Sequence, residues 1–214
     1  MRANGPERLA AVSRRRGIRD RRLLEAIAAV PRAGFVPRAQ GGRAYSDQPI
    51  PIGHDQVTTQ PSLVAAMVEA LRLEGEESVL EVGTGLGWQT ALLARLARRV
   101  FSIERFADLA EEARRNLERH GIRNAEVVVG DGTAGLPEEA PFDAILVSAA
   151  FTDVPEPLAA QLHDGGRLVQ PIGLGGNDQV TLFERHGEAL ERRASVIPAH
   201  FVRLYGEHGF IPPG

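Results

Sequence analysis

Residues 79–87, Val-Leu-Glu-Val-Gly-Thr-Gly-Leu-Gly, constrain the fold more than any other segment of this 214-residue chain. A short apolar run ends in glycines at every second position, and residues 90–96 follow with an apolar, helix-like pattern. This order predicts a buried strand, a tight turn and the start of a helix. Gly83, Gly85 and Gly87 lack Cβ atoms, so a ligand could lie against the backbone, where the helix presents free N–H groups. The alternative is a turn that serves close packing alone and binds nothing.

Two later strand ends carry acidic residues where a nucleoside ligand would need them. Glu104 ends the apolar run 100–103, at the distance from Gly87 where nucleotide-binding folds place a carboxylate that accepts both ribose hydroxyls. Asp131 follows the run 127–129, where a carboxylate could accept a hydrogen bond from an adenine amino group. Each acid alone would be an ordinary solvated loop residue. Three strand ends with fitting chemistry, in chain order, indicate one cleft at the carboxyl ends of the strands.

Strands and helices alternate along the middle of the chain. Strands are predicted near 78–82, 99–103, 125–129, 144–147 and 167–169, and helices near 61–71, 88–97, 107–120 and 155–163. Near-continuous apolar strands separated by amphipathic helices are typical of a parallel sheet covered on both faces. The tail differs, with strands predicted at 179–184, 194–196 and 200–205 and no helices between them. We therefore expect an α/β fold with a doubly wound, mostly parallel seven-stranded sheet and antiparallel C-terminal strands.

The first 61 residues differ from the rest. A helix is predicted over 21–30 and ends at Pro31, and residues 31–61 are rich in proline, glycine and polar residues. A connection of that length in a compact chain is usually functional or disordered, and its scattered apolar residues favour an ordered lid. We predict one domain over 1–214, with an N-terminal helical arm and lid (1–61) before the ligand-binding core (62–214).

Composition excludes several chemistries. The chain has no cysteine and no lysine, so it has no disulfide, thiolate nucleophile, lysine Schiff base or P-loop lysine. Its six histidines lack the paired spacing of metal ligands, so we expect no metal. No apolar run approaches the roughly 18 residues of a membrane span, and Met1–Pro6 lacks the hydrophobic core of a secretion signal. We therefore expect a cytoplasmic protein with no membrane partner.

The formal net charge of −3 conceals an asymmetry. Residues 1–32 carry nine arginines against three acidic residues, a net +6, so the remainder carries −9. A basic arm can bind nucleic acid or acidic peptides. We favour a solvated helix face instead, because few aromatic residues lie between the arginines to stack on bases. Accordingly, we expect no nucleic-acid partner.

The order of motifs in the chain resembles one enzyme family. The N-terminal segments that carry the resemblance are Arg16–Arg21, Val30–Arg32, Phe35–Pro37, Ala44–Gly53 and Gln56–Pro61. They are followed by Val79–Thr90, Ser102–Arg105, Gly130–Gly132, Pro141–Asp143 and Gln170–Gly173. From about Arg14 to Phe210, the chain resembles the protein-L-isoaspartate O-methyltransferases. The glycines are shared with many S-adenosylmethionine-dependent methyltransferases, whereas the segment from Tyr45 to Pro61 is far more specific to this family.

The resemblance implies a class I, Rossmann-like methyltransferase that uses S-adenosylmethionine and releases S-adenosylhomocysteine. The acceptor would be the free α-carboxylate of L-isoaspartyl residues in damaged proteins and peptides. The ester would collapse to a succinimide, which starts repair towards aspartate. We expect a monomer that acts on such peptides and proteins.

Site residues follow from the resemblance and from the strand-end argument. For the cofactor we predict Gln56, Val57, Thr58, Thr59, Glu81, Gly83, Thr84, Gly85, Gly87, Gln89, Thr90, Glu104, Arg105, Asp131, Gly132 and Ser148. For the substrate we predict Tyr45, Asp47, Ile52, Gln60, Ala149, His200 and Phe201. For Tyr45 the alternative is a core aromatic residue.

Thr59 stands where the family usually has the serine of its active site. A carboxylate with a pKa of about 4 is ionised at neutral pH, so methyl transfer needs in-line placement and a dry pocket, not a base. We predict that the Thr59 hydroxyl orients the carboxylate. The alternative is that Thr59 only caps the helix that begins at Pro61.

Besides Thr59, three positions depart from the family pattern. Asp55 replaces a second glycine, Val57 replaces a small hydroxyl residue, and His200 replaces the arginine that would flank the substrate peptide. These changes leave cofactor use intact and leave the peptide preference open. Competing hypotheses are a carboxyl methyltransferase for an aspartate of a modified peptide, a protein that binds or methylates RNA, and a cofactor-binding module without catalysis.

Overall fold

A computed structural model describes residues 5–212 of the chain; the terminal residues outside this range include Arg2 of the basic arm. The α-helices are α1 (Pro6–Arg15), α2 (Arg21–Ala29), α3 (Pro61–Ala70), α4 (Trp88–Leu96), α5 (Ala107–Arg119) and α6 (Glu156–Ala160). The strands are β1 (Ile50–Gly53), β2 (Gln56–Thr58), β3 (Ser78–Val82), β4 (Arg99–Glu104), β5 (Ala125–Val129), β6 (Phe142–Val147), β7 (Leu162–Ile172), β8 (Asp178–His186) and β9 (Ala189–Ala199). Short 3-10 helices are η1 (Arg32–Phe35), η2 (Arg38–Arg43), η3 (Gly132–Ala134) and η4 (Pro137–Glu139). Within residues 5–212, no helix has the length and apolar character needed to cross a membrane.

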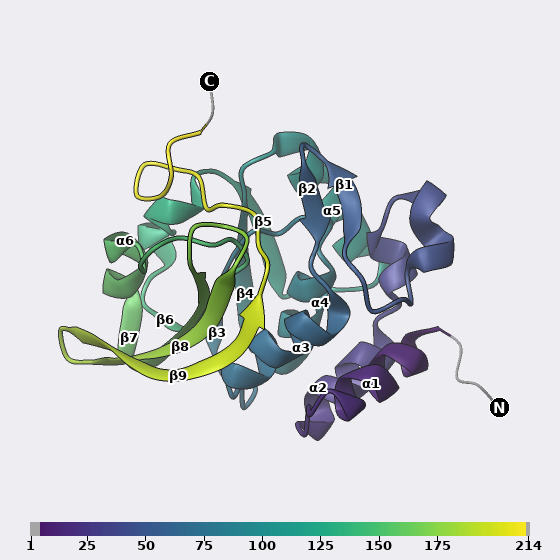
Figure 1. Cartoon of the computed structure of the whole chain (residues 1–214), viewed down its shortest axis with the longest axis horizontal. Coiled ribbons are helices and arrows are strands. Elements are labelled where there is room, and N and C mark those ends of the chain that lie inside the picture. Colours follow the sequence, from purple (N-terminus) through teal and green to yellow (C-terminus); the bar gives the residue numbers. More distant parts are fainter. Residues whose placement is uncertain (1–4, 213–214) are drawn as a thin grey trace.

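Seven strands form the central sheet, in the order β5-β4-β3-β6-β7-β8-β9 (Figure 1). Pairing is parallel from β5 to β7 and antiparallel between β7, β8 and β9. The chain runs outward from β3 to β5 and then returns to the other side of β3 as β6. The order therefore reverses beside β3, and open sheets of this kind bind ligands at such a point. The expected α/β fold with antiparallel C-terminal strands is confirmed.

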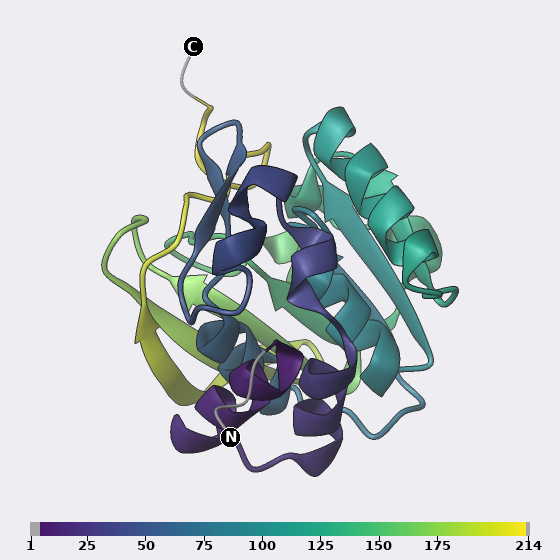
Figure 2. The same cartoon turned by 90° about the vertical axis from the view of Figure 1, so that its right-hand side faces the viewer.

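Helices cover both faces of the sheet, but unequally. Adjacent β3 residues point to opposite faces, and both Val79 and Leu80 are fully buried in separate apolar clusters. The Val79 face packs against residues from all of α1 to α5, including Leu9 and Ile27 of the N-terminal arm. The Leu80 face is covered by α6 through Leu158 and by irregular segments. Figure 2 shows the N-terminal helices lying across the helical layer.

The C-terminal third departs from the secondary structure expected. Residues 200–205 are not a strand: Arg203 makes an isolated bridge to Ala150, because its neighbour is the loop after β6 and not a sheet edge. Strand β7 begins before the predicted 167–169, and the Gly165–Gly166 pair lies within it. A register shift against β6 accommodates these extra residues. Helix α6 is correspondingly shorter than the predicted 155–163.

The segment 31–61 is ordered, and it contains an antiparallel β1–β2 hairpin that was not predicted. Its turn residues His54 and Asp55 have φ angles of 52° and 55°. Asn-Gly or Asp-Gly usually adopts that conformation in a hairpin turn, so His-Asp at this position does not indicate a turn. The His54 ring stacks on Phe106, and its Nε2 lies 2.8 Å from Asp108 Oδ2, which ties the tip to the start of α5. The hairpin and the C-terminal segment lie at the same end of the molecule (Figures 1 and 2).

Helix α3 is capped from the lid and not by its own flanking residues. Gln60 occupies the N-cap position without a side-chain cap. Instead, Asp47 Oδ1 accepts a hydrogen bond from the Ser62 amide at 2.9 Å, and Oδ2 accepts from Ser62 Oγ and Gln60 Nε2. The carboxylate also lies favourably at the positive end of the helix dipole. Thr59 therefore does not serve as the cap that we considered for it.

We expect Asp47→Ala to lower the free energy of unfolding by about 1–2 kcal/mol, which is typical of a lost helix cap. Urea denaturation followed by circular dichroism measures this change. Glu112→Ala removes an exposed carboxylate of α5 and is the matched control, with an expected change within about 0.5 kcal/mol. Equal losses in the two variants would contradict the capping role.

Candidate active site

The glycine turn joins β3 to α4 at the centre of the sheet. Gly83, Gly85 and Gly87 have φ angles of 96°, 56° and 92°, which L side chains rarely adopt. A Cβ built on Gly85 would lie 3.3 Å from Ile52 Cδ1 of the hairpin, and one on Gly83 would lie 3.4 Å from Ser148 Cβ. The backbone conformation therefore favours glycine at all three positions, and the lid and the loop after β6 approach Gly85 and Gly83 closely.

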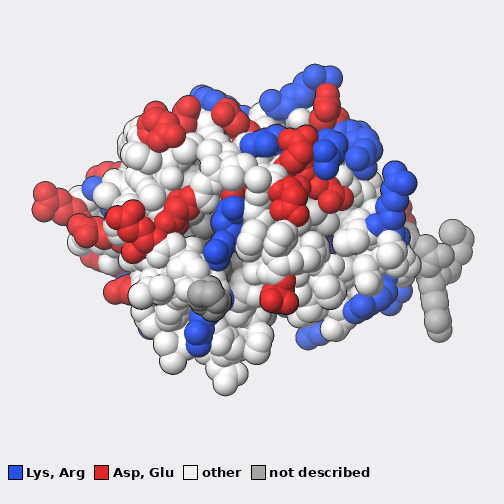
Figure 3. Space-filling model, turned by 90° about the horizontal axis from the view of Figure 1, so that it is seen from above, with Lys and Arg blue, Asp and Glu red and all other residues white. Residues whose placement is uncertain are grey.

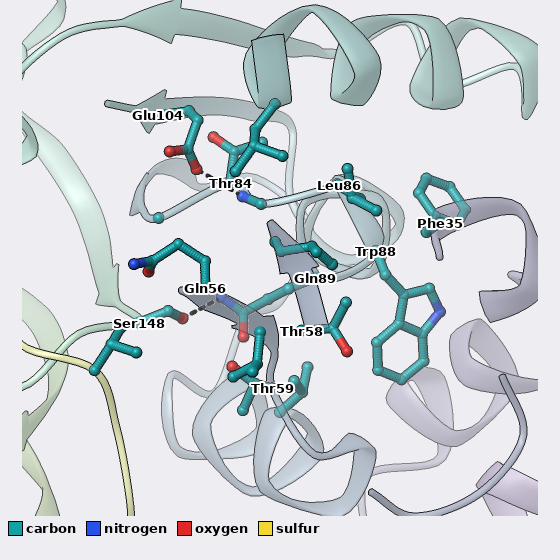
Figure 4. Close-up of a pocket in the computed structure, with 18 residues that line it drawn as sticks. Phe35, Gln56, Thr58, Thr59, Thr84, Leu86, Trp88, Gln89, Glu104 and Ser148 are labelled. Carbon is teal, nitrogen blue, oxygen red and sulfur yellow. Dashed lines mark hydrogen bonds between the residues drawn. The ribbon is translucent and has the colours of Figure 1, made fainter. Parts of the chain in front are cut away.

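Three adjoining cavities surround this turn. The turn cavity lies between the glycine turn and the hairpin, and Figure 4 shows its lining residues. The tail cavity extends it beneath residues 202–205 of the C-terminal segment. The turn and tail cavities are narrow, about 80 and 70 Å³, whereas the arm cavity between α1, α3 and the end of β9 measures about 730 Å³.

Most predicted site residues line these cavities. The turn cavity is lined by Ile52, Gln56, Val57, Thr58, Thr59, Gly83, Thr84, Gly85, Gly87, Gln89, Glu104 and Ser148. The tail cavity adds Arg105, Gly132 and Ala149, and the arm cavity adds Gln60, His200 and Phe201. Four residues, Val57, Thr59, Ser148 and Val202, border both the turn and the arm cavities. These four mark the junction of a glycine-lined site with a larger, mainly apolar one.

Five predicted site residues line none of the three cavities: Tyr45, Asp47, Glu81, Thr90 and Asp131. Tyr45 packs against the apolar clusters, in agreement with the alternative of a core aromatic residue. Asp47 is the cap of α3. The Asp131 carboxylate accepts hydrogen bonds from Thr133 and from the Glu207 amide, so the C-terminal segment uses its oxygens. Glu81 and Thr90 lie behind the glycine turn.

Glu81 is the centre of a buried polar network. Its side chain is fully buried, Oε1 accepts from Gln89 Nε2 at 2.9 Å, and Oε2 accepts from the Thr90 and Ser102 hydroxyls. Burial raises the pKa of Glu81 to about 7, although these three donors oppose the shift. The network reaches the cavities through Thr84, which bonds Ser102, and through Gln89.

Glu104 is placed as a ribose-binding acid should be. It lines the turn cavity at the end of β4, and Oε2 accepts from the Gly85 amide at 2.8 Å while Oε1 accepts from the Phe106 amide. The carboxylate is thereby fixed against the glycine turn (Figure 4). Burial raises the pKa of Glu104 against the opposing effect of these amides.

Arg32 organises the lid, a role that its neighbours in the sequence do not indicate. Its side chain is fully buried, and burial lowers the pKa to about 10, so it stays charged at neutral pH. The guanidinium donates to the carbonyls of Ala44, Ser46 and Gln48 on one side of the hairpin. On the other side it donates to Thr58 Oγ1 at 2.6 Å and to the Thr59 carbonyl. The Thr58 hydroxyl is therefore occupied by Arg32, and Thr59 is held at the cavity junction.

Other lining residues also lay outside the predictions. They are Phe35, Val64, Leu86, Trp88, Leu109 and Val202 in the turn cavity, Tyr205 in the tail cavity and Arg16 in the arm cavity. Val202 and Tyr205 come from the segment that was expected to be an edge strand. Their positions depend on how the tail crosses the strand ends, which no local pattern indicates. Of these lining residues, Trp88 alone could have been predicted for the site from sequence, because it directly follows the third glycine of the turn.

The sequence was compared with known protein families and proteins. The family model described as Protein-L-isoaspartate(D-aspartate) O-methyltransferase (PCMT) matches residues 5–209. The chain belongs to this family. Members of the family are S-adenosylmethionine-dependent methyltransferases, and the resemblance stated from the motifs is confirmed.

Individual family members support the assignment along nearly the whole chain. A protein-L-isoaspartate O-methyltransferase from Anaeromyxobacter dehalogenans is 53% identical over 190 residues, which cover 88% of this chain and 91% of the relative. One from Geobacter metallireducens is 48% identical over 195 residues, covering 91% and 90%. A solved protein-L-isoaspartate O-methyltransferase structure superposes with a TM-score of 0.83 at 30% identity, covering 95% of this chain and 67% of that one. A Plasmodium falciparum structure in complex with S-adenosyl-L-homocysteine has a TM-score of 0.79 at 23% identity, covers 95% and 99%, and supports the fold alone.

The raised pKa of Glu81 predicts how stability depends on pH. In the unfolded chain a glutamate has a pKa of about 4.3, whereas Glu81 in the folded protein has one of about 7. Between these values the folded protein binds more protons, so the free energy of unfolding falls as pH rises. We expect wild type to lose about 3 kcal/mol relative to Glu81→Gln between pH 4.5 and 7.5. Urea denaturation across this range measures the difference.

The exposed Glu112→Gln variant is the matched control, and its stability should stay parallel to that of wild type at every pH. A difference between wild type and Glu81→Gln that is constant, or that grows in favour of wild type as pH rises, would contradict the prediction.

Proposed function

We propose that this enzyme methylates the free α-carboxylate of L-isoaspartyl residues, with the cofactor in the turn and tail cavities and the acceptor in the arm cavity. The observation that carries this proposal is the junction at Thr59 and Ser148, which border both the glycine-lined site and the larger one. A transferase needs such a shared wall, because donor and acceptor must meet there.

The residues of the turn cavity fit S-adenosylmethionine. Gly83 to Gly87 offer an open backbone, and Gln89 Oε1 is a buried acceptor without a hydrogen-bond partner among the described residues. The ammonium group of the methionine part would satisfy that acceptor, and Glu104 would accept from the ribose hydroxyls. The base would lie in the tail cavity, near Arg105 and Tyr205. The role of Asp131 at the adenine amino group stays a prediction.

Methyl transfer here depends on placement. When bound, the cofactor supplies a sulfonium-activated methyl group, and the acceptor carboxylate is already ionised at neutral pH. Thr59 would donate a hydrogen bond to one carboxylate oxygen and so direct the other, while apolar Val57, Val202 and Leu63 exclude water. Holding the reactants as near-attack partners can contribute several kcal/mol, and no general base is needed.

The narrowness of the turn cavity sets a condition on binding. A nucleoside with an amino acid attached would have to extend over both the turn and the tail cavities, and a shift of the hairpin would widen the turn cavity. Such a shift would loosen the contacts at the hairpin tip, which are the exposed His54–Asp108 pair and the stacking of His54 on Phe106. The exposed pair contributes little to stability.

Finer features of the function are also proposals. We propose that the methyl ester initiates protein repair, that the enzyme acts as a monomer, and that it works in the cytoplasm, whose reducing conditions suit a cysteine-free sequence. The division at residue 61 into arm and core stays a prediction.

The basic arm favours a structural role over RNA binding. Arg22 donates to the carbonyls of Leu73 and Leu96, and Arg19 donates to that of Arg14. Seen onto the cavity end, arginines gather on the side of the N-terminal arm and acidic residues dominate the side of the C-terminal strands (Figure 3). Arg22 thus fastens the arm to the core, and Arg19 is used within the arm, which supports a structural role for these two arginines over nucleic-acid binding.

A pair of peptides tests the proposed function. The peptides share one sequence and differ only in an aspartyl or isoaspartyl linkage, and both are incubated with radiolabelled S-adenosylmethionine. We expect base-labile label on the isoaspartyl peptide alone, because only that linkage presents a free α-carboxylate beside a side-chain amide. Equal labelling of both peptides, or of neither, would remove the assignment.

The role of Thr59 is tested by Thr59→Val, which keeps the shape and removes the hydroxyl. We expect kcat/KM for the isoaspartyl peptide to fall about 10- to 100-fold, as expected for a lost hydrogen bond to a charged group. The Kd of S-adenosylhomocysteine, measured by calorimetry, should change less than about threefold. Thr152→Val, at an exposed position in the loop after β6, is the matched control and should retain full activity. Undiminished transfer by Thr59→Val would refute the orienting role.

A further inference from the structure

Ser148 lines the turn, tail and arm cavities, and of the two described residues that do so, Ser148 and Val202, it alone carries a hydroxyl group. It follows β6 directly, at the carboxyl end of the strand next to β3. Thr59 reaches the same junction from the loop between β2 and α3. Two hydroxyl groups on different elements therefore face the place where donor and acceptor must meet. Figure 4 shows the Ser148 hydroxyl joined by a hydrogen bond to the Gln89 amide.

The hydrogen-bond pattern determines how the Ser148 hydroxyl is used. Gln89 Nε2 lies 2.9 Å from Glu81 Oε1 and 2.7 Å from Ser148 Oγ. Thr90 and Ser102 both donate their hydroxyl hydrogens to Glu81 Oε2, so the ionised Glu81 carboxylate acts as the acceptor of this network. It therefore requires the NH₂ group of Gln89 on its side.

One amide proton of Gln89 goes to Glu81 and the other to Ser148. Ser148 Oγ is thus an acceptor in this bond, and its own proton stays available to an occupant of the cavity.

We propose that Ser148 is a second substrate-orienting residue, whose hydroxyl donates to the acceptor carboxylate together with Thr59, and that Gln89 is the positioning residue that aims it. This inference rests on the proposed function. A carboxylate held by one donor can still turn about that hydrogen bond. A second donor from another element fixes the plane of the group, and with it the direction of the attacking oxygen.

The arrangement is rigid because it is buried. Gln89 is 7% exposed and Glu81 is fully buried, so the amide cannot exchange its partners for water. Gln89 lines the turn cavity and also bonds Ser148, which lines the arm cavity, so the same side chain connects both halves of the site. Gln89 therefore connects the cofactor side of the cavity with the hydroxyl on the acceptor side.

Three variants test Ser148 and Gln89, with initial rates measured against an isoaspartyl peptide at saturating S-adenosylmethionine. Ser148→Ala should lower kcat/KM for the peptide about tenfold, the effect of one lost hydrogen bond. It should leave the Kd of S-adenosylhomocysteine within about twofold of wild type. Ser148→Thr keeps the hydroxyl and should recover most of the activity. Gln89→Met should lower kcat/KM in the wild-type background but change it less than about twofold when Ser148→Ala is already present.

Each other outcome overturns part of the inference. If Ser148→Ala weakens S-adenosylhomocysteine binding tenfold and leaves peptide kinetics intact, Ser148 is a cofactor contact only. If it changes neither, Ser148 has no role in the reaction. If the effects of Gln89→Met and Ser148→Ala are additive, Gln89 does not act through Ser148. Wild-type enzyme that fails to label the isoaspartyl peptide overturns the proposed function and this inference together, whereas active wild type with an unaffected Ser148→Ala overturns this inference alone.

Discussion

The buried guanidinium of Arg32 is the interaction on which the lid and the candidate site depend. An isolated charge in an apolar interior is costly, and it is tolerated only when hydrogen bonds surround it. Here the acceptors are four backbone carbonyls and the Thr58 hydroxyl, drawn from both sides of the hairpin. These hydrogen bonds hold the lid, an irregular segment with few apolar residues, in one conformation over the strand ends. Thr59, next in sequence to Thr58, takes its place at the cavity junction as a result.

A second polar network lies on the other side of the cavity, beneath the glycine turn. Glu81 binds Gln89, Thr90 and Ser102, and so joins β3, α4 and β4. Its members are buried and nearly all satisfied, which is the condition under which such networks make a structure rigid. The exception is Gln89 Oε1, a buried acceptor without a partner among the described residues. The site is thus built between two fixed polar groups, a cation in the lid and a carboxylate in the core.

The sequence predicted those parts of the molecule that repeat a local pattern. The parallel strands, the glycine turn and Glu104 followed from apolar runs and from what stands at their ends. The hairpin could not be predicted, because His54 and Asp55 adopt a turn that such residues seldom form. Asp47 was taken for a substrate residue because sequence cannot show that it caps a helix 15 positions away.

The tail was misjudged for a related reason. Apolar residues at 200–205 pack over the loop after β6, and a buried extended segment has the same composition as a strand. The contributions of Val202 and Tyr205 depend on that crossing. Arg32 gave no signal of its role, because its acceptors are mostly main-chain atoms, which every residue possesses.

The capping of α3 by Asp47 has a mechanical consequence for the hairpin. Arg32 fastens residues 44–48 at one end and residues 58–59 at the other, while Asp47 is anchored on Gln60 and Ser62. Movement of the entire lid would break the hydrogen bonds of the Arg32 guanidinium and those that cap the N-terminus of α3. Residues 49–57 are therefore the part of the lid that can move as a flap while the hydrogen bonds of the two flanking segments stay intact. Such a flap can rise enough to admit a ligand while residue 59 stays where it is.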